Sequence, residues 1–105
     1  MTERRRLPNR RRSETFDFIA QGMKFTATFS RGDNGSVQEI FLTNHRASSQ
    51  AGINASDAAL VASIALQHSV PFDTIRKALS RDSQGRGSGP LAVAMDAIAI
   101  MDNEP

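Results

Sequence analysis

Hydrophobic and polar residues alternate with a period of two in the first part of the chain. Phe16 and Phe18 have polar neighbours, and residues 23 to 29 place an apolar side chain at every second position. A third alternating segment covers residues 37 to 43, with Ile40 and Leu42 on one side. This period is typical of strands with one buried face, so the pattern predicts three strands.

Turn-forming residues separate the three segments. Gln21-Gly22 stands between the first and the second, and Asn34-Gly35 lies in the polar run between the second and the third. Asn-Gly readily supplies the positive φ angles of a tight hairpin. We therefore predict an antiparallel meander of three strands, whose open edges would allow self-association into a homodimer.

The pattern becomes helical in the second half of the chain. We expect residues 44 to 54 to form a loop and Ser56 to cap a helix that begins at Asp57. Residues 57 to 67 are apolar or small nearly all round, which predicts a central helix covered on most sides.

Two more helices are predicted after this one. Pro71 and the apolar positions that follow at i, i+3 and i+7 predict a short second helix. Residues 80 to 89 are rich in glycine and serine and predict a loop, after which Pro90 opens a last helix with Leu91, Met95 and Ile98 on its apolar face. The expected architecture is an α+β domain, β-β-β-α-α-α, with the helices on one face of the sheet.

Composition bounds the function of the chain. With 105 residues, 39% hydrophobic and 23% charged, it can build one modest core. It contains no cysteine, and no apolar run is long enough to span a membrane, so we expect a cytoplasmic protein. His45 and His68 have no partners at metal-ligand spacing, and no catalytic constellation is visible. We predict a protein that is not an enzyme and has no cofactor.

Positive charge is concentrated at the N-terminus. Residues 1 to 12 carry a net charge of +5, and residues 13 to 105 carry −3, which together give the +2 of the whole chain. The arginines of this segment are Arg4, Arg5, Arg6, Arg10, Arg11 and Arg12. We predict an unstructured basic arm at residues 1–13, one domain at residues 14–101 and a frayed tail at 102–105. Such an arm could bind a phosphate backbone, or it could contact acidic protein surfaces.

Residues 57–79 fit the spacing of a helix-turn-helix. Ser69 occupies the turn position where glycine is usual, and Arg76 and Lys77 would be the basic contacts of the second helix. Any two short helices packed across a tight turn satisfy the same pattern. The segment therefore supports either nucleic-acid binding or a helical hairpin within the core.

The glycine-rich loop offers a second candidate site. It precedes a predicted helix N-terminus, where backbone N–H groups could hold a phosphate. The proposed anion contacts are Arg46, Arg81, Arg86 and Ser88. The loop matches neither a Walker nor a Rossmann motif, so a simple connection between helices is the alternative.

Several short motifs occur in an order that resembles a known family. They include Glu39-Ile40-Phe41-Leu42, Ser63-Ile64-Ala65-Leu66, Val70-Pro71 and Asp96-Ala97-Ile98-Ala99. The chain resembles the TSCPD-type domain found at the C-terminus of adenosylcobalamin-dependent ribonucleotide reductases. Where that family has Ser-Cys-Pro, this chain has Val93-Ala94-Met95.

The resemblance implies an accessory role. In those reductases the radical chemistry belongs to a large barrel with active-site cysteines and cobalamin, and this chain has neither the barrel nor a cysteine. The resemblance thus implies a docking or regulatory protein with a protein partner, such as a reductase or another nucleotide-handling protein. The alternative is a nucleic-acid-binding protein that uses the arginine arm.

Overall fold

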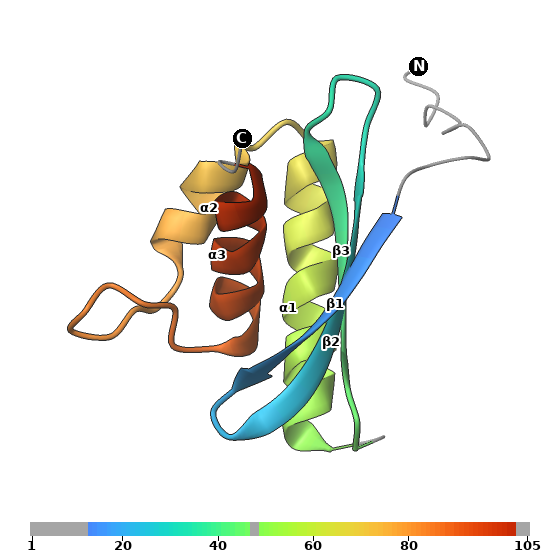
Figure 1. Cartoon of the computed structure of the whole chain (residues 1–105). Coiled ribbons are helices and arrows are strands. Elements are labelled where there is room, and N and C mark those ends of the chain that lie inside the picture. Colours follow the sequence, from blue (N-terminus) through green and yellow to red (C-terminus); the bar gives the residue numbers. More distant parts are fainter. Residues whose placement is uncertain (1–12, 47–48, 103–105) are drawn as a thin grey trace.

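The computed structural model describes residues 13–46 and 49–102, and its element order is the predicted β-β-β-α-α-α. The strands are β1 (Ser13–Ala20), β2 (Met23–Arg31) and β3 (Val37–Asn44), and the helices are α1 (Gln50–Gln67), α2 (Phe72–Ala78) and α3 (Pro90–Asp102). The helices lie on one side of the sheet (Figure 1). The predicted α+β class is confirmed.

The sheet is an antiparallel meander in the order β1-β2-β3. Gln21 and Gly22 both have positive φ, 54° and 75°, and close the first hairpin in two residues. Because side chains alternate along each strand, one face of the sheet is apolar. Its largest fully buried residues are Phe25 and Phe29 on β2 and Ile40 and Leu42 on β3.

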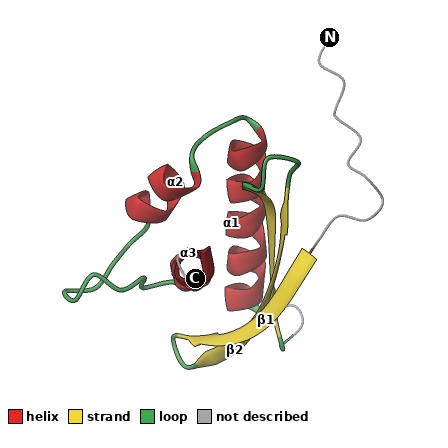
Figure 2. Ribbon diagram, turned by 45° about the horizontal axis from the view of Figure 1, so that its top comes forward, coloured by secondary structure: helices red, strands yellow, loops and turns green. Residues whose placement is uncertain are grey.

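Two helices cover this apolar face. α1 packs along β3, and α3 packs against β1 and α1, while α2 contacts α3 from outside this layer (Figure 2). Leu91, Met95 and Ile98 of α3 are buried, as predicted. Met95 and Ile98 are completely enclosed and complete the core beside the strands.

The start of α1 was predicted wrongly. The helix begins at Gln50, and its N-cap is Ser49, whose side chain accepts the Gly52 N–H at 3.0 Å, so Ser56 lies inside the helix. A Cβ atom at position 52 would lie 3.0 Å from the Cβ of Asn44. A side chain at position 52 would thus crowd the end of β3, which favours glycine in the first turn of α1, and this glycine does not mark a loop.

The expectation that α1 is covered on most sides was also wrong. Its buried residues are Ala55, Ala59, Ala62, Ser63 and Leu66, which form one side of the helix. α1 lies over the last strand of the sheet, and α3 flanks it on one side (Figure 2). The side that points away from the sheet is therefore exposed.

Candidate functional site

The outer face of α1 is the most exposed apolar surface on a helix of the described chain. It consists of Ile53, Leu60, Val61 and Ile64, whose exposed fractions are 47%, 55%, 66% and 51%. These positions are spaced i, i+7, i+8 and i+11, which places them on one side of the helix. Asp57 lies among them and is the single charged residue of α1.

The opposite side of α1 is fixed to the backbone of β3. The buried Ser63 Oγ accepts the Ile40 N–H at 2.9 Å, and its single proton has two carbonyl acceptors within reach, Ile40 at 3.0 Å and Ala59 at 2.9 Å. One turn later, Gln67 Nε2 donates to the Gln38 carbonyl at 3.3 Å. The two side chains bind backbone groups at the outer edge of β3, so the outer face is carried on a helix that is fixed to the sheet.

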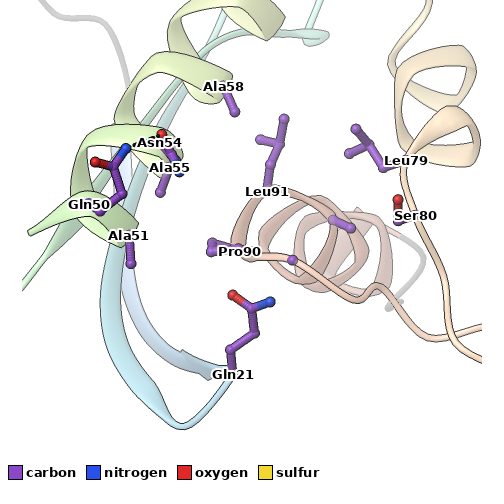
Figure 3. Close-up of a pocket in the computed structure, with 12 residues that line it drawn as sticks. Gln21, Gln50, Ala51, Asn54, Ala55, Ala58, Leu79, Ser80, Pro90 and Leu91 are labelled. Carbon is purple, nitrogen blue, oxygen red and sulfur yellow. Dashed lines mark hydrogen bonds between the residues drawn. The ribbon is translucent and has the colours of Figure 1, made fainter.

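A pocket of about 470 Å³ opens on another side of α1. Four segments form it: the β1–β2 turn, the first turns of α1, the end of α2 with Ser80, and the start of α3 (Figure 3). Its walls are mostly alanine, leucine and proline, and its polar side chains are Gln21, Gln50, Asn54 and Ser80. The pocket therefore combines an apolar interior with uncharged polar groups.

Asp96 is the centre of the main ion-pair cluster in the described residues. Its two carboxylate oxygens accept from Arg81 Nη1 and Nη2, each at 2.9 Å, and from Arg76 Nη1 at 3.2 Å. The Gly87 N–H donates a further bond at 3.2 Å. Through these contacts Asp96 joins α3 to α2 and to the glycine loop.

The hydrogen bonds of this cluster hold its charges in place. The bonds from Arg81 lower the pKa of Asp96, against the opposing effect of partial burial. The pKa of Arg81 is raised by its bonds to Asp96, and that of Arg76 is raised by Asp73 first and Asp96 second. All members of the cluster are therefore charged at neutral pH, and Asp96 already neutralises part of the positive charge.

The structure does not bring the predicted anion contacts together. Arg81 is bound to Asp96, whereas Arg86 and Ser88 are exposed on the glycine loop. Arg46 is exposed just after β3, and the end of β3 lies at the bottom of Figure 1, away from the glycine loop at its left. An anion at the loop would meet Arg86 and Ser88 without Arg46.

The glycine loop is an ordered connection. The Asp82 Oδ1 accepts the N–H groups of Gln84 and Arg86, each at 2.9 Å, and these bonds lower the pKa of Asp82. A Cβ atom at position 87 would lie 2.6 Å from the Cβ of Ala92. The close approach of the loop to α3 thus explains Gly87 without a ligand.

The candidate nucleic-acid contacts differ from one another in their surroundings. The arginine arm, residues 1–12, lies outside the described residues. Ser69 has φ of 72°, so the tight turn between α1 and α2 exists, but Arg76 points to Asp96. Lys77 is exposed near the end of α2.

Sequence reasoning missed the partner of Asp96. A signal was present, because Asp96 lies in the middle of the apolar run of α3, and a partly buried carboxylate needs a counter-charge. The same reasoning could not say which arginine would provide it. Arg81 and Arg76 precede Asp96 by 15 and 20 residues.

Neither histidine is part of a metal site. The His45 Nε2 lies 3.2 Å from Thr26 Oγ1, and His68 is exposed at the end of α1. Within residues 13–46 and 49–102, no group of three or more histidine, aspartate, glutamate or cysteine residues could hold a metal ion. No helix of the described segments is long and apolar enough to cross a membrane.

Comparison with known protein families identifies the family of this chain. The family model described as the TSCPD domain matches residues 2–101, which is nearly the whole chain. The match includes α3 with Asp96 and extends into the arginine arm. No curated protein matches, and no solved structure matches.

Proposed function

This chain belongs to the TSCPD domain family, and on that premise we propose that it is a non-catalytic accessory protein that binds a protein partner through the outer face of α1. The proposed partner is a protein of nucleotide metabolism, and a ribonucleotide reductase is the first candidate. The reason is the resemblance of the chain to the C-terminal domain of such reductases.

The observation that supports binding is the exposure of four aliphatic side chains on a single helix face. Burying a Val, Leu or Ile side chain completely contributes roughly 1.5–3 kcal/mol, and each residue of the outer face still exposes about half of its surface or more. Contiguous apolar patches of this kind mark interaction sites on folded proteins. A partner that covered the outer face would gain several kcal/mol from it.

The charge of α1 favours a protein over a nucleic acid at this surface. Asp57 is its single charged residue, and its side chain would repel phosphate groups. A nucleic-acid interface is instead rich in lysine and arginine. A partner with an aliphatic groove and a basic or neutral rim fits the outer face best.

Co-purification tests this proposal. The tagged full chain is used to capture proteins from its host, and binding to the purified host reductase is then measured by calorimetry. We expect Ile64→Glu to abolish capture, because it places a charge in the apolar contact. The matched control is Ile19→Glu, which makes the same change at a residue that is 68% exposed on β1.

The result separates the possible functions. Equal capture by the wild type and by Ile64→Glu would contradict binding through the outer face. Recovery of nucleic acid in place of protein, with a strong salt dependence and loss on removal of residues 1–12, would support the alternative that the arginine arm binds nucleic acid. Capture of a protein that is not a reductase would support binding through the outer face but would contradict the proposed identity of the partner.

A further inference from the structure

The pocket beside α1 has a chemical character that the outer face lacks. No charged side chain lines it, and the groups that can form hydrogen bonds are three carboxamides and one hydroxyl. Figure 3 shows Gln21 on the β1–β2 turn close to Pro90, and Gln50 beside Asn54 on α1, with Ala51 nearer to Pro90. A volume of about 470 Å³ is within the range of sites for small molecules.

Two of the carboxamides are joined and form a polar edge. Gln50 Nε2 donates to Asn54 Oδ1 at 3.0 Å. Within the described residues, neither side chain makes another hydrogen bond. The Gln50 carbonyl oxygen and the Asn54 amide nitrogen can therefore each bind a further partner. One is an acceptor and the other a donor. Together they match a ligand that presents a donor beside an acceptor.

The other walls of the pocket determine which shape and polarity the rest of the ligand must have. Ala51, Ala55 and Ala58 line the α1 side, and Leu79 and Leu91 lie across from them. Small side chains on one wall and aliphatic ones on the other suit a flat apolar ring. A charged ligand would lose hydration without meeting a counter-charge on the lining.

We propose that this pocket binds a small flat ring compound with an uncharged amide edge. The edge is either a carboxamide on the ring or a lactam within the ring. The carboxamides of Gln50 and Asn54 bind the edge, and the walls cover the faces of the ring. This inference does not rest on the proposed function, because it concerns a small molecule between α1 and α3, whereas the proposed function concerns a protein that covers Ile53, Leu60, Val61 and Ile64.

Nuclear magnetic resonance of the full chain tests the proposal. Benzamide, uracil and benzoate are titrated separately, and the backbone amide shifts of Asn54 and Leu91 are followed. We expect shifts with benzamide, uracil or both, and about fivefold weaker binding of benzoate, which cannot donate a hydrogen bond to the Gln50 carbonyl. Stronger binding of uracil identifies the lactam edge, and stronger binding of benzamide identifies the ring carboxamide.

Three variants keep the test specific. Ala58→Leu fills the pocket and should weaken binding at least as much as the change of probe, whereas Ala78→Leu makes the same change at an exposed position of α2 and should bind like the wild type. Asn54→Asp changes the exposed polar edge with little risk to folding. No shifts with either amide, equal binding of benzoate, or unchanged binding by Asn54→Asp would overturn the proposal.

Discussion

The two faces of α1 differ in the size of their side chains more than in their polarity. The buried face is formed mainly by Ala55, Ala59 and Ala62, whereas the outer face carries two isoleucines, a leucine and a valine. An ordinary amphipathic helix turns its large aliphatic residues toward the core. The comparison teaches that the fold needs a thin helix against β3. Leu66 is the large aliphatic residue that α1 buries, and Ile53, Leu60, Val61 and Ile64 stay exposed.

The largest expected effect comes from enlarging the buried face. Ala59 is 1% exposed, and Ala59→Leu would add three carbon atoms where α1 packs on the sheet. Overpacking of this kind costs about 1–3 kcal/mol, and we expect the upper end because the Ser63 contacts hold the helix in place. Urea denaturation would measure the loss in the free energy of unfolding.

The reverse change on the adjacent residue is the control. Leu60→Ala removes the same three carbon atoms from the outer face and should change the free energy of unfolding by less than about 0.5 kcal/mol. A large loss of stability from Leu60→Ala would contradict the difference between the two faces. It would mean that the outer face serves the fold.

A smaller effect is expected from the polar contact on the buried face. Ser63→Ala leaves the buried Ile40 N–H without its partner, and we expect a loss of about 1–2 kcal/mol after the better helix propensity of alanine is counted. Ser56→Ala, at an exposed position of the same helix, should be neutral or slightly stabilising. Equal effects of the two substitutions in urea would show that Ser63 does not hold α1 on β3.

The smallest effect is expected away from α1, where charge joins the helices. The folded-state pKa of Asp96 is lowered, so its ionised form stabilises the fold at neutral pH. Asp96→Asn should lower the free energy of unfolding by about 1 kcal/mol at pH 7, since the cluster is partly exposed to solvent.

The pH dependence identifies the source of this effect. The contribution of Asp96 is complete above the pKa of an unfolded aspartate, about 3.9, and is lost as the pH falls through the lowered folded value. The difference between the wild type and Asp96→Asn in urea should therefore shrink below about pH 4. A difference that stayed constant with pH would assign the effect to packing and not to charge.

Much of the fold could be predicted from local patterns. The alternation along the strands and the Gln21-Gly22 turn identify the meander, because both depend on neighbouring residues alone. Leu91, Met95 and Ile98 were predicted correctly for the same reason. In each case, the spacing of apolar residues within one element determines the buried face.

The failures concern contacts between distant segments. Residue 52 was predicted to lie in a loop, but it lies inside α1, where the close approach of Asn44 favours glycine. The exposed side of α1 could not be recognised from the sequence. Apolar residues occur on nearly all sides of this helix, and few polar residues indicate which side faces solvent. The pocket was missed because it joins four segments, and the sequence does not show their arrangement.

The hydrogen bonds from Ser63 and Gln67 to β3 also limit how the sheet could grow. They engage backbone groups of Ile40 and Gln38 that a further strand would otherwise use. In the described part of the chain, β1 is the sheet edge without such bonds. Two copies that paired through β1 would form a six-stranded sheet with β3 at both ends, where α1 leaves fewer backbone groups for another strand than a bare edge would.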